Sequence, residues 1–148
     1  MVMKTIVLMI SEHFPVSHIR YGEPTKLVDK LLKQKIHTIR ENYENWVKRA
    51  ELINSGNAFL SVRHWSGRPY RSRQVEIARI STIAIQKLVM SYSFADGTIT
   101  ACVEDRELKD INILSHNDGL ALDDFRSWFF SKEDKFNGVI IHFTNLLY

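Results

Sequence analysis

The sequence predicts an α+β fold in which a small β-barrel is flanked by helices. Three observations support this prediction: two helical segments lie early in the chain, alternating strand patterns fill its middle, and one further helical segment precedes the last strand. This separation of helical and strand-rich stretches is typical of α+β proteins. No repeat, low-complexity tract or proline-rich linker interrupts the chain, which indicates a single domain over residues 1–148.

The first part of the chain is predicted to contain a strand, a helix, a short strand and a second helix. The apolar run 5–10 predicts a strand, because charged residues follow it at once and it is too short to span a membrane. Pro24 is expected to open a helix over 25–34, whose leucines recur at helical spacing. KIHTIR (35–40) indicates a loop that passes into a short strand, and 41–56 indicates an amphipathic helix that ends in Asn-Ser-Gly.

The rest of the chain is predicted to be mostly strand. The expected elements are, in order, a strand at 57–65, one bent strand or two short strands at 74–90, a hairpin at 91–103, a loop at 115–119, a helix at 120–130 and a buried strand at 136–147. An acidic stretch between the hairpin and the loop, EDRELKD, is expected to be a solvated connection.

Composition excludes several classes of function. The formal net charge is only +3, so any affinity for nucleic acid must come from a local patch. The six histidines show no metal-ligand spacing and Cys102 is the one cysteine, so we expect neither a metal nor a cofactor. A single cysteine also fits a reducing compartment, which predicts a cytoplasmic protein without a membrane partner. The glycine-rich phosphate loop and the G-x-S-x-G elbow are both absent.

Lys35, Thr38 and Arg40 form the first candidate site. A partly desolvated lysine can act as a base near neutral pH, and a threonine hydroxyl can attack a carbonyl or donate to an oxyanion. Arg40 offers a planar fork for a phosphate or a base carbonyl. Ordinary surface roles for all three side chains are the alternative.

The second candidate site is the segment 63–73, RHWSGRPYRSR. Arginines here can bind phosphates while aromatic faces stack on unpaired bases, as in recognition of single-stranded RNA. The alternative is a polar hairpin whose aromatic side chains pack on the barrel. The residues expected to contact nucleic acid are Arg63, Trp65, Arg68, Tyr70, Arg71 and Arg73.

Three stretches together resemble the ASCH domain family, which shares the PUA-like barrel fold. KIHTIR matches its K-x-x-T-x-R element, SHNDGLALDDFRSWF resembles the acidic residue and helix of its second landmark, and FNGVIIHFTNL is similar to its closing strand. The resemblance spans nearly the whole chain. It implies RNA binding, and it implies the fold of a PUA-like small β-barrel flanked by helices.

The resemblance also implies an alternative activity. Some compact bacterial ASCH proteins hydrolyse the acetyl amide of N4-acetylcytidine with a Lys, a Thr and a Glu, which correspond here to Lys35, Thr38 and Asp118. Asp118 is one methylene shorter than the family glutamate, and an ordinary Asx turn or helix entry is its alternative role. His37 and His116 are expected to line the same cleft as Lys35, Thr38 and Asp118.

Two hypotheses therefore follow from the sequence. The first is a domain that binds RNA or a modified nucleoside or nucleotide in a cleft lined by Lys35, Thr38 and Arg40. His37 is expected as a further contact there, and residues 63–73 would extend the basic surface. The second is an amidohydrolase acting on an acylated cytidine. The sequence leaves the oligomeric state open.

Overall fold

The computed structural model describes residues 2–148 and has an α+β fold with two sheets. Its helices are α1 (Leu27–Lys30), α2 (Tyr43–Asn54), α3 (Ile111–Asn117) and α4 (Leu122–Phe130). Its strands are β1 (Lys4–Met9), β2 (His37–Arg40), β3 (Ala58–Trp65), β4 (Gln74–Ile80), β5 (Ala84–Ser93), β6 (Thr98–Val103), β7 (Arg106–Glu107) and β8 (Lys135–His142).

The two sheets are open, and the predicted small β-barrel is wrong. One sheet has the order β1-β3-β4, with β1 parallel and β4 antiparallel to β3, and the other has the order β2-β8-β5-β6-β7. A barrel would require the edge strands of these sheets to pair in a staggered register, and no such pairing joins them within residues 2–148. Residues 74–90 form two strands, because the chain leaves the first sheet after Ile80 and enters the second at Ala84.

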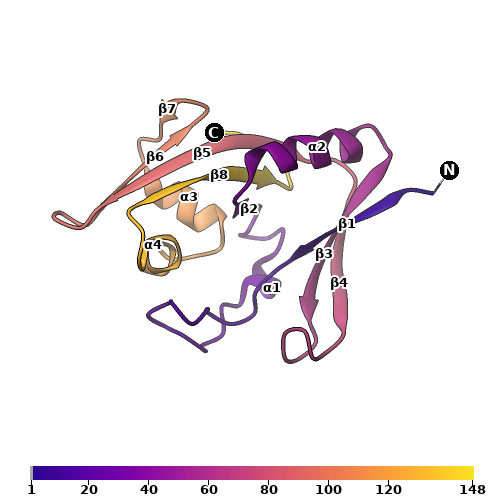
Figure 1. The fold of residues 1–148 in the computed structure, drawn as a ribbon, viewed down its shortest axis with the longest axis horizontal. Coiled ribbons are helices and arrows are strands. Elements are labelled where there is room, and N and C mark those ends of the chain that lie inside the picture. The colour runs from indigo at the N-terminus through magenta and orange to yellow at the C-terminus, as the bar shows by residue number, and fades with distance from the viewer. Residues whose placement is uncertain (1) are drawn as a thin grey trace.

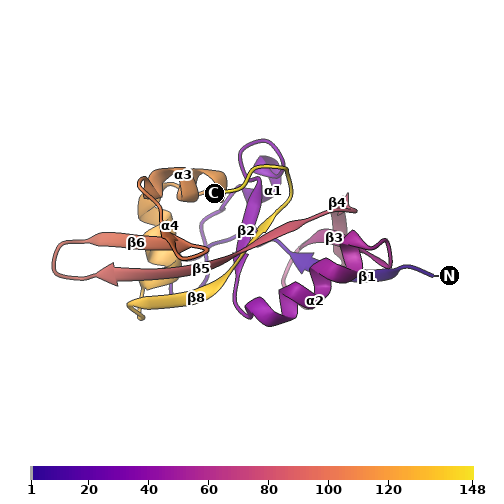
Figure 2. The same cartoon turned by 90° about the horizontal axis from the view of Figure 1, so that it is seen from above.

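Helices cover the second sheet and connect it to the first. α3 and α4 lie together on one side of the second sheet, and α2 lies across the region where the two sheets approach each other (Figures 1 and 2). α2 contacts β3 of the first sheet and both β5 and β8 of the second, and it buries Trp46, Ala50 and Ile53 there. Figure 1 also shows the long connection between β1 and α1 passing beneath α4.

Two helices differ from the sequence-based expectation. The helix expected over 25–34 is reduced to the four residues of α1, because Lys26 and Leu32 on either side adopt left-handed conformations with φ of 61° and 63°. The tight turn that follows delivers Lys35 to the interior. The loop expected at 115–119 begins inside α3, whose first turn is capped by the side chain of Asp110 accepting from the Asn112 amide at 3.0 Å.

The core lies between the second sheet and its helices and continues to the first sheet, where Leu8, Leu60 and Val62 are buried. Phe125 of α4 and Leu114 of α3 are fully buried against strand residues such as Leu88, Ile140 and Ile141. Phe125 and Phe130 of α4 are buried, and Leu122, Trp128 and Phe129 are partly buried. No helix within residues 2–148 is long and apolar enough to cross a membrane.

Candidate functional site

A buried ion pair joins the turn after α1 to the end of α3. The Lys35 ammonium donates to the Asp118 carboxylate Oδ1 at 3.0 Å and to the Asp118 main-chain carbonyl at 2.9 Å. The side chains are only 3% and 6% exposed. Asp118 is the C-cap of α3, so it does not occupy the helix entry considered as its alternative role.

Gly119 permits this close approach of the two segments. Its φ is +89°, a conformation that other residues rarely adopt, and it ends the turn that carries Asp118. A Cβ at this position would lie 2.7 Å from Leu27 Cδ2 and 3.2 Å from Lys35 Cβ. The Asn-Asp-Gly sequence therefore packs the helix end directly on Lys35.

Burial and charge shift the pKa values of the pair in physically distinct ways. Burial lowers the pKa of the Lys35 ammonium, and the Asp118 charge opposes that change only in part. Burial by itself would raise the pKa of Asp118, but the charge and hydrogen bond of Lys35 together with His37 hold it below the ordinary value of 3.8. The site thus combines a firmly ionised carboxylate with an amine that is easier to deprotonate than an exposed lysine.

Thr38 and Arg40 line the same small cavity as the ion pair. β2 holds both residues by antiparallel pairing with β8, where Thr38 lies opposite Ile141 and Arg40 opposite Val139. The cavity has a volume of about 80 Å³ and is enclosed by Lys35, Thr38, Arg40, Asp118, Ile10, Ser11, Leu27, Ile39, Leu120, Trp128 and Phe129. The structure therefore brings together all three residues of the K-x-x-T-x-R element and Asp118.

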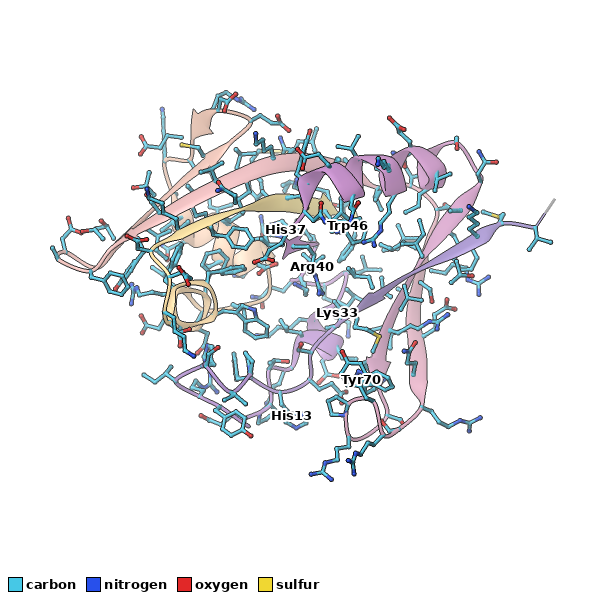
Figure 3. The ribbon with its side chains drawn as sticks, viewed as in Figure 1. His13, Lys33, His37, Arg40, Trp46 and Tyr70 are labelled. Carbon is cyan, nitrogen blue, oxygen red and sulfur yellow. The ribbon has the colours of Figure 1, made fainter. Side chains whose placement is uncertain are left out.

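Arg40 lies where this inner cavity meets a larger outer cleft. The outer cleft, of about 590 Å³, shares Arg40, Ile10 and Ser11 with the inner cavity. One Arg40 Nη donates to the Met9 carbonyl at 2.6 Å, whereas its buried Nε has no hydrogen-bond partner among residues 2–148. Figure 3 shows Arg40 between the sheets, with His13 and Tyr70 on the side of the outer cleft.

Aromatic side chains from two parts of the chain wall the outer cleft. Phe14 and Tyr21 come from the connection between β1 and α1, whereas Trp65 is the last residue of β3 and Tyr70 lies in the turn that follows it. The Trp65 and Tyr70 rings contact each other with centroids 5.1 Å apart, and Tyr70 is 89% exposed. Such a cleft has the size of an ordinary small-molecule site and offers faces on which a planar ligand can stack.

The arginines of the segment 63–73 fall into two groups. Arg68, Arg71 and Arg73 are exposed and make no ion pair within the described part of the chain. Arg63 is instead tied to the sheet, because its guanidinium donates to Ser61 Oγ at 2.9 Å and to Gln74 Oε1 at 3.0 Å. Three of the four predicted arginines therefore lack an ion-pair partner among the described residues, but none of the four lines the cleft, which the same segment lines through Trp65, Gly67, Pro69 and Tyr70.

The two histidines expected in the cleft lie elsewhere. His116 is exposed on α3, outside the described cavity and cleft. His37 is completely buried behind the ion pair, with Nδ1 at 3.4 Å from Asp118 Oδ1 and Nε2 at 2.7 Å from the Tyr148 hydroxyl. Tyr148 was not expected from the sequence, because a tyrosine far along the chain carries no local sign of this contact.

The connection that walls the cleft is fastened to α4. Arg20 donates to the Asp124 carboxylate at 2.7 Å, and buried His18 contacts the Asp124 main-chain carbonyl at 2.9 Å. The Ile19 amide donates to Ser127 Oγ at 2.9 Å. These contacts hold Phe14 and Tyr21 over the outer cleft.

Comparisons with known proteins add no information on this site. No protein-family model, curated protein or solved structure matches the chain. Within residues 2–148, no group of three or more His, Cys, Asp or Glu side chains is placed to hold a metal ion. The geometry of the cavity and cleft therefore provides the evidence on function.

Proposed function

We propose that this protein binds a nucleobase, presented by RNA or by a modified nucleoside or nucleotide, in the outer cleft and inner cavity. The observation that carries this proposal is that the inner cavity and the outer cleft share Ile10, Ser11 and Arg40, which places aromatic walls beside convergent buried polar groups. Ligand sites commonly combine a mostly apolar wall with a few polar groups that fix orientation.

The chemistry of the lining matches a nucleobase. Trp65 and Tyr70 supply faces for stacking, and stacking is worth about 1–3 kcal/mol per base. At the inner end, Lys35 donates, Asp118 accepts and Thr38 can do either, so the cavity complements a planar edge that carries both donors and acceptors. The resemblance of Lys35-x-x-Thr38-x-Arg40 to the ASCH element supports the same class of ligand.

The exposed arginines favour a ligand with a phosphate backbone. Arg68, Arg71 and Arg73 lie on the turn that carries Tyr70 and directly follows Trp65, the last residue of β3. Cationic side chains beside stacking faces are typical of proteins that bind single-stranded nucleic acid. RNA bound in this way would lose affinity as salt rises, because each neutralised phosphate releases counterions.

Fluorescence anisotropy with short labelled single-stranded RNAs tests this proposal. Replacement of Arg40 by Met should weaken binding about tenfold or more, because a charged hydrogen bond is lost. The matched control is Arg79→Met, since Arg79 lies on β4 outside the cleft and stacks on Phe59. Replacing Arg68, Arg71 and Arg73 by Gln should reduce the salt dependence. Absence of binding to RNA, nucleosides and nucleotides would contradict the proposal.

A second candidate function is hydrolysis of an acyl amide on a cytidine such as N4-acetylcytidine. The specific observation that favours it is the buried Lys35–Asp118 pair, which shares a cavity of about 80 Å³ with Thr38. The lowered pKa of Lys35 makes its ammonium easier to deprotonate than an exposed lysine, as the role of a base requires. Thr38 would then be nucleophile or oxyanion donor, and Asp118 would orient or shuttle the proton.

Release of cytidine from N4-acetylcytidine by the purified protein tests this second function. Release should vanish in Lys35→Ala and persist in Lys33→Ala, a matched control at an exposed lysine on the same turn. Release that survives in Lys35→Ala would refute the assigned role of Lys35. A protein that binds nucleobases but releases no cytidine from several acylated cytidines would be a binding domain only.

A further inference from the structure

A chain of hydrogen-bonding groups lies behind the ion pair, on the side away from the cavity. The Tyr148 hydroxyl lies 2.7 Å from His37 Nε2, and the Asn117 side-chain amide donates to the same hydroxyl at 3.0 Å. On its other side the His37 ring presents Nδ1 to Asp118 Oδ1 at 3.4 Å. Figure 3 shows His37 deep between the elements, beyond Arg40.

The contacts of both ring nitrogens favour one tautomer of His37. The Tyr148 oxygen already accepts from Asn117, so the pairing that uses its own proton is donation to an unprotonated His37 Nε2. The neutral ring consequently carries its proton on Nδ1. The Asp118 carboxylate requires the same tautomer independently, because an unprotonated Nδ1 would turn a lone pair toward its negative charge.

The main chain of Tyr148 is fixed as firmly as its hydroxyl. Its amide donates to Gln86 Oε1 at 3.0 Å, and its main-chain oxygen accepts from Gln86 Nε2 at 2.9 Å and from Arg106 at 2.8 Å. Gln86 also faces His142 Nε2 at 2.9 Å. A residue held from β5 and from β7 has little freedom to move its ring away from His37.

We propose that Tyr148 and His37 are positioning residues for Asp118: the Tyr148 hydroxyl selects the Nδ1–H tautomer of His37, which holds the Asp118 carboxylate toward Lys35. His37 Nδ1 is buried and makes no regular hydrogen bond within residues 2–148, and the acceptor that it faces is the Asp118 carboxylate at 3.4 Å. When a ligand accepts a hydrogen bond from the Lys35 ammonium, the contact with His37 still holds the Asp118 carboxylate in place. Only this last consequence rests on the proposed function.

Nitrogen-15 spectra of the histidine rings in the ligand-free protein test the proposal directly. The His37 signals are assigned by their loss in His37→Gln. In the wild-type protein Nδ1 should be protonated and Nε2 unprotonated. Tyr148→Phe keeps the ring but removes the hydroxyl donor. In this variant the His37 Nε2 resonance should move toward the position of a protonated ring nitrogen. The carbon-13 resonance of the Asp118 side-chain carboxyl should also shift. Tyr92→Phe is the matched control, because the Tyr92 ring stacks on Phe130 far from this cluster.

The spectra remain informative whether or not the protein binds a nucleobase. A protonated Nε2 in the wild-type protein, or unchanged His37 and Asp118 signals in Tyr148→Phe, would overturn the proposal. If the RNA or nucleoside assay is positive, Tyr148→Phe should also weaken binding about two- to tenfold, the range expected for one hydrogen bond. If Tyr148→Phe gives the expected spectra but binds the ligand with unchanged affinity, the proposed effect of the positioned Asp118 carboxylate on ligand binding is refuted.

Discussion

Replacement of Lys35 by Met should destabilise the protein strongly, even though Met retains most of the lysine stem. The substitution removes the ammonium from a pair whose side chains are 3% and 6% exposed. Asp118 would then be left as a buried carboxylate, with His37 as its remaining neighbour at 3.4 Å. Its main-chain carbonyl would also lose a donor at 2.9 Å.

The magnitude follows from the burial of the pair. Breaking a buried ion pair by removing one partner costs about 3–5 kcal/mol, whereas an exposed pair is worth about 0–1 kcal/mol. Since His37 still faces Asp118, we expect the free energy of unfolding to fall by about 3 kcal/mol, at the lower end of the buried range. For a chain of this size that corresponds to a decrease in Tm of about 6–12 °C.

Urea unfolding of the wild type, Lys35→Met and the exposed control Lys33→Met measures this loss. In the wild type the lowered pKa of Asp118 stabilises the fold above pH 3.8, and this stabilisation is lost as pH falls through the lower folded value. In Lys35→Met the charge of Lys35 no longer opposes burial and only the effect of His37 remains, so the pKa of Asp118 should rise above its wild-type value. Acidification should therefore narrow the difference in free energy of unfolding between variant and wild type. A loss below about 1 kcal/mol at pH 7 would refute the buried pair, because that is the range of exposed pairs.

Three further predictions concern the surroundings of the site. Gly138→Ala would press a Cβ against the Arg40 carbonyl oxygen, so urea unfolding should show a loss of about 2–3 kcal/mol. Burial and His37 lower the pKa of His142 from 6.5 to about 4. As the pH is lowered through this range, the unfolded chain therefore takes up the proton before the folded chain does. The free energy of unfolding should decrease by about 2 kcal/mol over the range, after a discount for solvent screening. A flat urea midpoint over that pH range would contradict this. Asp124→Asn removes the charge that binds Arg20, so amide exchange in the segment between β1 and α1 should accelerate; unchanged exchange would show that the charge does not fasten it.

Local periodicity accounts for the elements that the sequence predicted well. α2 and α4 appear where apolar residues recur at helical spacing, and the strands of the β5–β6 hairpin appear where β-prone segments flank Ala95-Asp96-Gly97. Burial along β5 alternates at Gln86, Leu88 and Met90 as a two-residue period requires. The α+β class can therefore be predicted from local sequence patterns alone.

The site was predictable only in part. The spacing of Lys35, Thr38 and Arg40 singled them out, and the resemblance added Asp118, and these four residues do line one cavity. The sequence places His37 near the cleft only because it lies between Lys35 and Thr38, and local sequence does not show which elements pack on each face of this strand. In the structure its side of β2 meets Tyr148 and His142 in the interior.

What the sequence determined by itself is the order and type of most elements and a short set of polar residues worth examining. Tertiary structure alone decided that the sheets stay open, that α1 stops after four residues, and that Tyr148 lies behind Asp118. The physical reason is range: periodicity reports which face of an element is buried, whereas strand-edge pairing and contacts between distant residues depend on how all the elements pack together.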